Sequence, residues 1–152
     1  MGLFDSDSEE PKSKIRRYIV TGVALALLLS WGAWYLFRFH AEKKTVETFL
    51  NAVARGDLQE AYRLWQPRPS YAFQDFVEDW GPTGYYGPVK TYQIETAQRE
   101  SGASGVVVVV ELSPFAPFPA ANESERLRQM KGARLWVEVK TQAISFAPAP
   151  LN

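Results

Sequence analysis

The sequence contains no cysteine and only one histidine, His40. Without cysteine the chain has no disulfide bond, no thiol nucleophile and no thiolate metal ligand. The histidine stands beside a long apolar run, a position more typical of a membrane–water interface than of a catalytic base. We therefore expect no metal, no cofactor and no catalytic residue, and hence no enzyme activity.

Charge is also missing from one long stretch of the chain. No charged residue occurs between Arg17 and Arg38, where the sequence reads YIVTGVALALLLSWGAWYLF. A helix of about 20 residues spans about 30 Å, the thickness of a bilayer's hydrocarbon core. A buried core helix would be shorter and amphipathic, and a cleaved signal peptide would end in small residues at a cleavage site. We predict a disordered polar tail over residues 1–14 and a membrane-spanning helix within residues 15–40.

The ends of the apolar run carry side chains suited to a membrane surface. Aromatic rings favour the headgroup region, and Lys and Arg flank a span on the polar side. The expected interface residues are Arg16 and Arg17 at the start, and Trp31, Trp34, Tyr35 and Arg38 at the end.

The orientation of the span follows from the positive charges beside it. Four basic residues precede the span, and three follow it closely, namely Arg38, Lys43 and Lys44. Basic residues near a span favour the cytoplasmic side, so the difference of one charge favours a cytoplasmic N-terminus. We expect a single-pass protein of the plasma (inner) membrane, with the C-terminal domain in the periplasm.

No excess of positive charge follows the span. From Ala41 onward the chain has 12 Lys and Arg residues against 13 Asp and Glu residues. A surface that binds nucleic acid needs a basic excess, so we expect no nucleic-acid partner.

Three amphipathic helices are expected after the span. Apolar residues recur at helical spacing from Val46 to Val53, then from Leu58 to Trp65, and again from Tyr71 to Trp80. Gly56 and Asp57 should end the first helix and cap the second, and Ser70 should cap the third.

Strand-like runs then take over. They cover residues 89–98, 103–112 and 133–146, with a hairpin turn at Gly102 between the first two. The run Val106–Val110 has no polar alternation, so both of its faces should be covered. In the last run Leu135 and Val137 alternate with Trp136 and Glu138, and a later shift of parity indicates a bulge or a bend. The fold class is α+β, with three helices packed on a bent antiparallel sheet of three or more strands.

The pattern V-x-x-F-L-x-A-x-x-x-G-D-x-x-x-A-Y-x-L-W over Val46–Trp65 resembles the opening helices of nuclear transport factor 2-like (cystatin-like) domains. The resemblance implies such a domain over residues 41–147, followed by a tail over 148–152. It implies a cone-shaped frame but no function, because the family contains enzymes, carriers and assembly scaffolds. Its enzymatic members keep Asp, Tyr or His inside the cone, whereas Asp75, Glu78 and Asp79 here lie opposite an aromatic stripe, as on a solvated helix face.

Exposed aromatic residues are the remaining functional signal. Tyr85 and Tyr86 lie in the loop GPTGYYGP, and Phe115 and Phe118 lie in a proline-rich loop. Tyrosine is favoured at partner surfaces, and apolar loops dock either on their own domain or on something else. We expect Tyr85, Tyr86, Phe115, Phe118 and Trp136 to form a partner surface or a pocket.

Two functions fit these features. The first is a non-enzymatic, membrane-anchored interaction or assembly module, an accessory component of a bacterial membrane protein complex. Its partners would be the lipid bilayer and a membrane protein or further copies of the chain. The alternative is a small-ligand-binding or hydrolytic domain, with a cavity lined by Tyr92, Trp136 and a polar residue such as Glu138.

Overall fold

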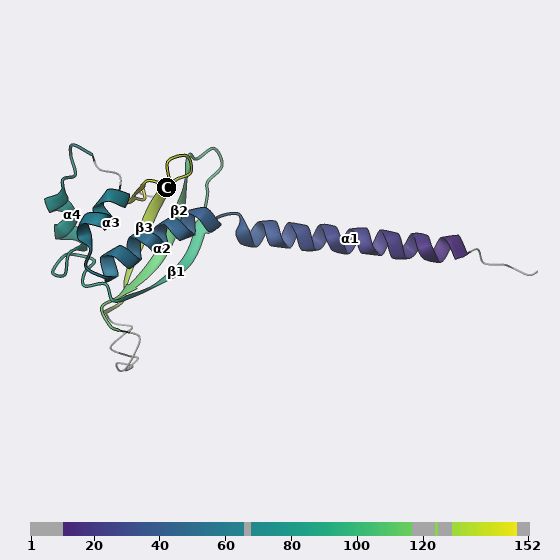
Figure 1. Cartoon of the computed structure of the whole chain (residues 1–152), viewed down its shortest axis with the longest axis horizontal. Helices are drawn as coiled ribbons and strands as arrows, with labels where there is room; N and C mark the ends of the chain where they lie inside the picture. Colours follow the sequence, from purple (N-terminus) through teal and green to yellow (C-terminus); the bar gives the residue numbers. More distant parts are fainter. Residues whose placement is uncertain (1–10, 66–67, 117–123, 125–128, 149–152) are drawn as a thin grey trace, which may run out of the picture. The chain divides into compact units, whose positions relative to one another are not determined.

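A computed structural model describes residues 11–65, 68–116, 124 and 129–148. The chain divides into two compact units, Met1–Arg38 and Phe39–Asn152. The first unit contains helix α1, and the described residues of the second form three helices followed by four strands (Figure 1). The elements are α1 (Pro11–Phe37), α2 (His40–Ala54), α3 (Leu58–Leu64), α4 (Phe73–Trp80), β1 (Thr91–Gln98), β2 (Gly105–Ser113), β3 (Lys131–Glu138) and β4 (Ile144–Phe146).

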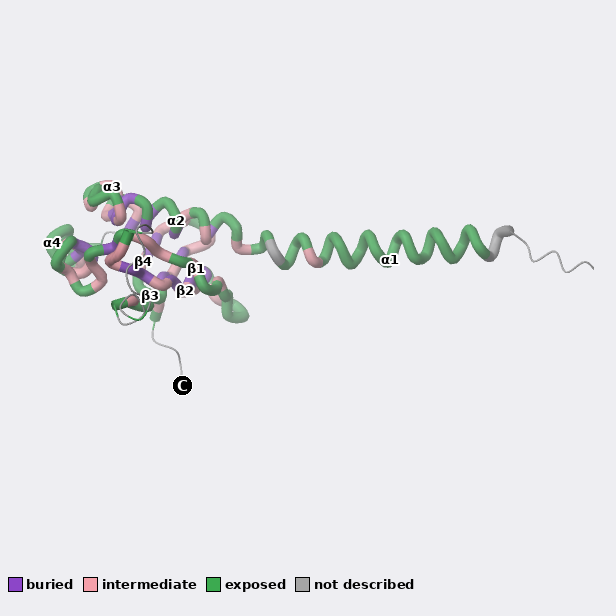
Figure 2. Tube along the Cα trace, turned by 90° about the horizontal axis from the view of Figure 1, so that it is seen from below, coloured by how far each residue is buried: buried purple, intermediate pink, exposed green. Residues whose placement is uncertain are grey.

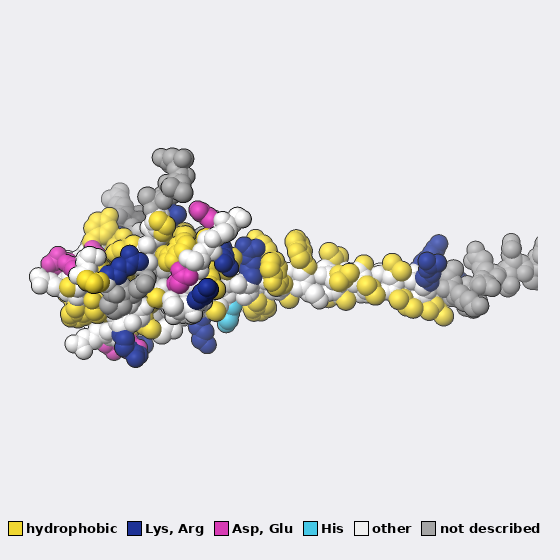
Figure 3. Space-filling model, turned by 90° about the horizontal axis from the view of Figure 1, so that it is seen from above, with side chains coloured by type: hydrophobic (Ala, Val, Ile, Leu, Met, Phe, Trp, Pro, Cys, Tyr) yellow, Lys and Arg dark blue, Asp and Glu magenta, His cyan; other side chains and the backbone are white. Residues whose placement is uncertain are grey.

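Helix α1 is long and apolar enough to cross a membrane. Its side chains are exposed along almost its whole length, and hydrophobic side chains cover it beyond a basic group near its start (Figures 2 and 3). The helix begins at Pro11, four residues before the expected boundary at residue 15. Proline suits the first helical position, and the polar residues after it continue the helix. The expected disordered tail otherwise falls on residues 1–10, outside the described part of the chain.

The turn between α2 and α3 agrees with the sequence-based prediction. Helix α2 ends at Ala54, and Gly56 has a φ of 79°, a conformation that glycine adopts without strain. The side chain of Asp57 caps α3, because its Oδ1 accepts a hydrogen bond of 3.1 Å from the backbone N–H of Glu60.

The expected cap of α4 is wrong. The helix begins at Phe73 rather than directly after Ser70. The backbone N–H of Ala72 donates a 2.7 Å hydrogen bond to Oδ2 of Asp75, so a carboxylate in the first turn satisfies this donor. Tyr71 therefore precedes the helix, and its backbone carbonyl accepts a 3.0 Å hydrogen bond from the hydroxyl of Tyr62 on α3.

The strands form one antiparallel sheet in the order β1-β2-β3-β4. The last apolar run contains two strands, because a turn between Glu138 and Ala143 separates β3 from β4. Gln142 in this turn has a φ of 57°. The turn explains the shift of parity: of the bulge or bend expected there, the chain has a change of direction and no bulge. The sheet has its register irregularity in β1 instead, between Ile94 and Thr96.

Helix α2 packs on one face of the sheet, and α3 packs against α2 (Figure 2). Phe49 of α2 lies at the centre of the core, with its ring centroid 5.4 Å from that of Trp65 and 5.0 Å from that of Trp80. Val106, Val108 and Val110 of β2 face the helices and are fully buried. Val107 and Val109 point to the other face and are half-buried, so the expectation of two covered faces is met on one face only.

Candidate functional site: an aromatic surface beside helix α4

The loop after α4 folds back onto the C-terminal end of that helix. The backbone N–H of Tyr85 donates to the carbonyl of Glu78 at 3.0 Å, and that of Tyr86 donates to the carbonyl of Asp79 at 2.8 Å. These bonds satisfy helix carbonyls that would otherwise lack partners. The two tyrosines are therefore held by backbone contacts on the last turn of α4.

Gly84 makes this close approach possible. A Cβ atom at Gly84 would lie 2.6 Å from the carbonyl oxygen of Glu78 and 2.8 Å from that of Asp79. Both are backbone atoms, so the loop would have to move away from α4.

We expect Gly84→Ala to lower the free energy of unfolding by about 1–3 kcal/mol, the usual cost of forcing an extra carbon into a packed site. Chemical denaturation followed by tryptophan fluorescence measures this change. The matched control is Gly132→Ala, because nothing lies within 4 Å of a Cβ there. Equal losses in the two variants would contradict the role assigned to Gly84.

Four aromatic rings, from Tyr71, Tyr85, Tyr86 and Phe146, form a continuous surface, called here the aromatic surface. The ring centroids of Tyr85 and Tyr86 are 4.9 Å apart, and Phe146 lies 5.7 Å from Tyr86 and 6.3 Å from Tyr71. Tyr85 is 69% exposed and Phe146 is 36% exposed. Large rings so placed present apolar area to solvent.

Trp80 supports the aromatic surface from below. Its ring stacks on Tyr86 with a centroid distance of 4.7 Å and lies 6.2 Å from Phe146 at an interplanar angle of 12°. The indole is almost fully buried, and its Nε1–H has no hydrogen-bond partner among the described residues. The surface therefore continues directly into the hydrophobic core.

A carboxylate is built into the edge of this surface. The hydroxyl of Tyr71 donates a 2.6 Å hydrogen bond to Oδ2 of Asp79. Burial raises the pKa of Tyr71, and the hydrogen bond and negative charge of Asp79 raise it further. Tyr71 thus keeps its proton at a pH where an unfolded tyrosine loses it.

This shift predicts a loss of stability in alkaline solution. An unfolded tyrosine loses its proton at about pH 10, whereas folded Tyr71 stays neutral there. Unfolding therefore releases a proton above that pH. The stability present below about pH 10 is therefore lost as the pH rises. We expect the free energy of unfolding to fall less steeply in Tyr71→Phe than in the wild type, as measured by urea titrations at neutral and alkaline pH. Parallel pH profiles would contradict this explanation.

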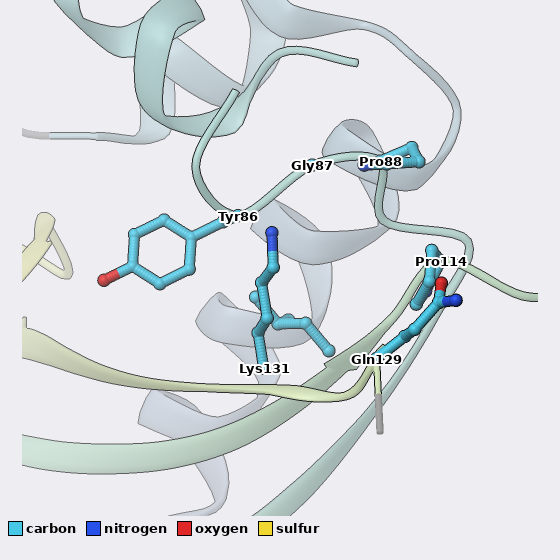
Figure 4. A pocket seen from close by; sticks show the side chains of 7 residues that line it. Tyr86, Gly87, Pro88, Pro114, Gln129 and Lys131 are labelled. Carbon is cyan, nitrogen blue, oxygen red and sulfur yellow. The ribbon is translucent and has the colours of Figure 1, made fainter. Parts of the chain in front are cut away.

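Lys131, the first residue of β3, borders the surface. Its Nζ lies 5.6 Å from the ring centroid of Tyr85 and donates a hydrogen bond to the backbone carbonyl of that residue. Figure 4 shows the lysine side chain rising between Tyr86 on one side and Pro114 and Gln129 on the other. These residues line a half-open hollow of about 290 Å³ beside the aromatic surface.

The structure brings together only part of the predicted site. Tyr85 and Tyr86 lie side by side, as described above. Phe115 is half-buried next to Pro114, and its carbonyl accepts a 3.0 Å hydrogen bond from Oγ1 of Thr91. Phe118 lies outside the described residues. Trp136 is half-buried on the face of the sheet that points away from the helices, where a Cβ at Gly105 would overlap its ring.

The cavity expected from Tyr92, Trp136 and Glu138 is not formed by these three side chains. Tyr92 pairs with Leu112 on the helix-facing side, and its hydroxyl contacts Oδ1 of Asn51 on α2 at 2.9 Å. Trp136 and Glu138 alternate with buried residues of β3 and point to the opposite face. The prediction placed residues from two faces of one sheet in the same pocket, and this was wrong.

The predicted membrane-interface residues lie near both ends of α1 and are exposed. The ring centroids of Trp31 and Tyr35 are 6.4 Å apart. The guanidinium carbon of Arg38 lies 5.7 Å from the ring centroid of Trp34 and 5.5 Å from that of Tyr35. Such cation–π contacts keep a charged group beside aromatic rings, an arrangement compatible with the headgroup region.

Comparison with known proteins identifies no relative of this chain. No protein-family model, no curated protein and no solved structure matches this chain. The function is therefore inferred from the chemistry of the site.

Proposed function

We propose that this chain is a membrane-tethered, non-enzymatic interaction or assembly module, an accessory component of a bacterial membrane protein complex. The observation that carries the proposal is the aromatic surface. Three large hydrophobic side chains of the second unit are exposed among the described residues, namely Phe73, Tyr85 and Phe146, and two of them belong to this surface. Apolar patches rimmed by polar residues mark contact sites for other molecules.

The attachment to the membrane is inferred from α1 and from the short segment that joins it to α2. Only Arg38 and Phe39 separate α1 from α2. If α1 spans the bilayer, a connection this short keeps the start of the domain close to the membrane surface. A partner in or near the same membrane would then meet the domain at a high effective concentration.

The proposed topology places the N-terminus in the cytoplasm and the domain in the periplasm, with the inner membrane between them. The four basic residues at the start of α1, before its apolar run, support this orientation. Reporter fusions test it: alkaline phosphatase at the C-terminus should be active, and a fluorescent protein at the N-terminus should fluoresce. The reverse pattern would rule out this orientation.

The proposed family is the nuclear transport factor 2-like one. Support comes from the Gly56–Asp57 turn between two helices and from the order of three helices followed by an antiparallel sheet. The family alone implies no activity, so the proposed function depends on the aromatic surface.

Co-purification tests the interaction directly. The full chain, carrying an affinity tag, is extracted from bacterial membranes in mild detergent, and its partners are identified by mass spectrometry. Tyr85→Ser should abolish co-purification of the partner, because it removes an exposed ring from the aromatic surface. The fold should be retained, because that ring contributes little to it. Gln93→Ser is the matched control, since Gln93 is exposed on β1 and should leave the partner bound. Recovery of the wild-type chain alone, as a monomer, would argue strongly against an assembly role.

A further inference from the structure

We propose that the aromatic surface binds a cationic segment of a partner protein, one that presents arginine or lysine side chains. The inference rests on the proposed function and names the chemistry of the partner.

Acidic residues lie on α4, the helix that carries the tyrosine loop. The carboxylate of Asp79 meets the aromatic surface directly, because its Oδ2 accepts a 2.6 Å hydrogen bond from the hydroxyl of Tyr71. Glu78 precedes Asp79 in the same turn and is exposed. Asp75 adds a third carboxylate one turn earlier on the same helix.

Two basic residues adjoin the same surface and reduce its negative charge. Lys131 lies over the ring of Tyr85, and the carbonyl of Arg68 accepts a hydrogen bond from the N–H of Tyr71. With the three carboxylates of Asp75, Glu78 and Asp79, the acidic and basic residues that adjoin the surface give a formal net charge of −1 (2 − 3). Burial is the largest cause of the raised pKa of Tyr71 and Tyr86, and the negative charge of Asp79 adds to both shifts.

The rings themselves suit a cation. The face of an aromatic ring carries partial negative charge, so an ammonium or guanidinium group within about 6 Å of the centroid is attracted. Lys131 already makes this contact with Tyr85 within the chain. The ring of Tyr85 stands nearly perpendicular to that of Tyr86, at an interplanar angle of 87°, so the two rings present differently directed faces.

A protein side chain fits this combination better than a small inorganic cation. Lysine and arginine have long apolar stems that can lie along the rings while the charged head reaches a carboxylate. A guanidinium group also stacks flat on an aromatic face. An exposed surface with separate rings and carboxylates therefore matches several basic side chains of one extended segment.

The test uses the full chain in a neutral detergent and an arginine–glycine repeat peptide. The control peptide carries citrulline, the uncharged analogue of arginine. Tryptophan fluorescence follows binding, because Trp80 lies directly under Tyr86 and Phe146. We expect the arginine peptide to bind about tenfold more tightly than the citrulline peptide at low ionic strength, and the difference to shrink as salt is added.

Three variants locate the contact. Glu78→Gln and Tyr85→Ala should each weaken binding about threefold, and their combination should weaken it about tenfold. Asp75 and Asp79 are not substituted, because both carboxylates accept hydrogen bonds within the fold. That of Asp75 accepts the N–H of Ala72 at the start of α4, and that of Asp79 accepts the hydroxyl of Tyr71. Glu95→Gln is the control: it removes the same charge from an exposed position on β1 and should change nothing.

The results separate the two proposals. Equal binding of the two peptides, or an equal loss in Glu95→Gln and Glu78→Gln, overturns the cationic partner. Self-association of the chain that Tyr85→Ala abolishes overturns it too, because the occupant would then be a second copy. If a partner co-purifies in a Tyr85-dependent way but the arginine and citrulline peptides bind equally well, only the inference of a cationic partner fails. If co-purification does not depend on Tyr85, the proposed function itself fails.

Discussion

Trp80→Ala is expected to lower the free energy of unfolding by about 3–5 kcal/mol, the range for removing a large aromatic side chain from a core. The ring is almost fully buried, and its centroid lies 5.0 Å from Phe49 and 4.7 Å from Tyr86. A domain typically has a stability of about 5–15 kcal/mol, so this loss brings the protein close to unfolding. Near-UV circular dichroism of the full chain in detergent, recorded during thermal melting, measures the change.

Trp34→Ala is the matched control for that experiment. It removes the same side chain from α1, where Trp34 is 61% exposed and belongs to the other compact unit. The melting of the second unit should not change. A similar loss in both variants would show that the melt does not report on the packing of Trp80 in the core.

The second large effect concerns the membrane. Leu27→Arg combined with Leu28→Arg places two charges at the middle of the apolar run of α1. Each arginine near the centre of a span costs about 2.5–3.5 kcal/mol on insertion scales, so the pair should prevent stable insertion. We expect the wild type to stay in the membrane pellet after alkaline carbonate extraction and the double variant to appear in the supernatant.

The matched control adds the same charges elsewhere. Gln93→Arg combined with Thr96→Arg changes two exposed positions of β1 and should leave the chain in the pellet. A double α1 variant that still resists extraction would contradict a spanning role for this helix.

Local chemistry explains why part of the fold was predictable. The turn between α2 and α3 depends on a glycine with positive φ and a capping carboxylate, and both signals lie within two neighbouring residues, Gly56 and Asp57. The alternation of buried and half-buried residues along β3 likewise follows from the period of a strand. These features need no knowledge of distant parts of the chain.

The features that failed depend on tertiary structure. The turn that separates β3 from β4 contains Gln142 at positive φ, and neither glycine, asparagine nor aspartate marks it in the sequence. Because that turn was missed, Phe146 was not placed beside Tyr86 and Tyr71. The contact of Tyr71 with Asp79 was also missed, because the helix was expected to begin at Tyr71 rather than at Phe73.

Only part of the candidate site could therefore be predicted from the sequence. Tyr85 and Tyr86 were identified, since two tyrosines in a glycine-rich loop rarely belong to a core. Lys131 lies 46 positions from Tyr85 in the chain, and only the pairing of β3 within the sheet brings it to the loop. A basic residue following a glutamine and a methionine gives no local sign of that contact.

Site-specific photo-crosslinking in living cells can show whether the aromatic surface contacts a partner. A photoreactive phenylalanine analogue replaces Tyr85 in one variant and Gln93, on β1, in another. We expect a crosslink from position 85 to another polypeptide, which is lost when Glu78→Gln and Phe146→Ala are added, and no such product from position 93. Crosslinks of equal yield from both positions, or none from position 85, would contradict a partner surface formed by these aromatic residues.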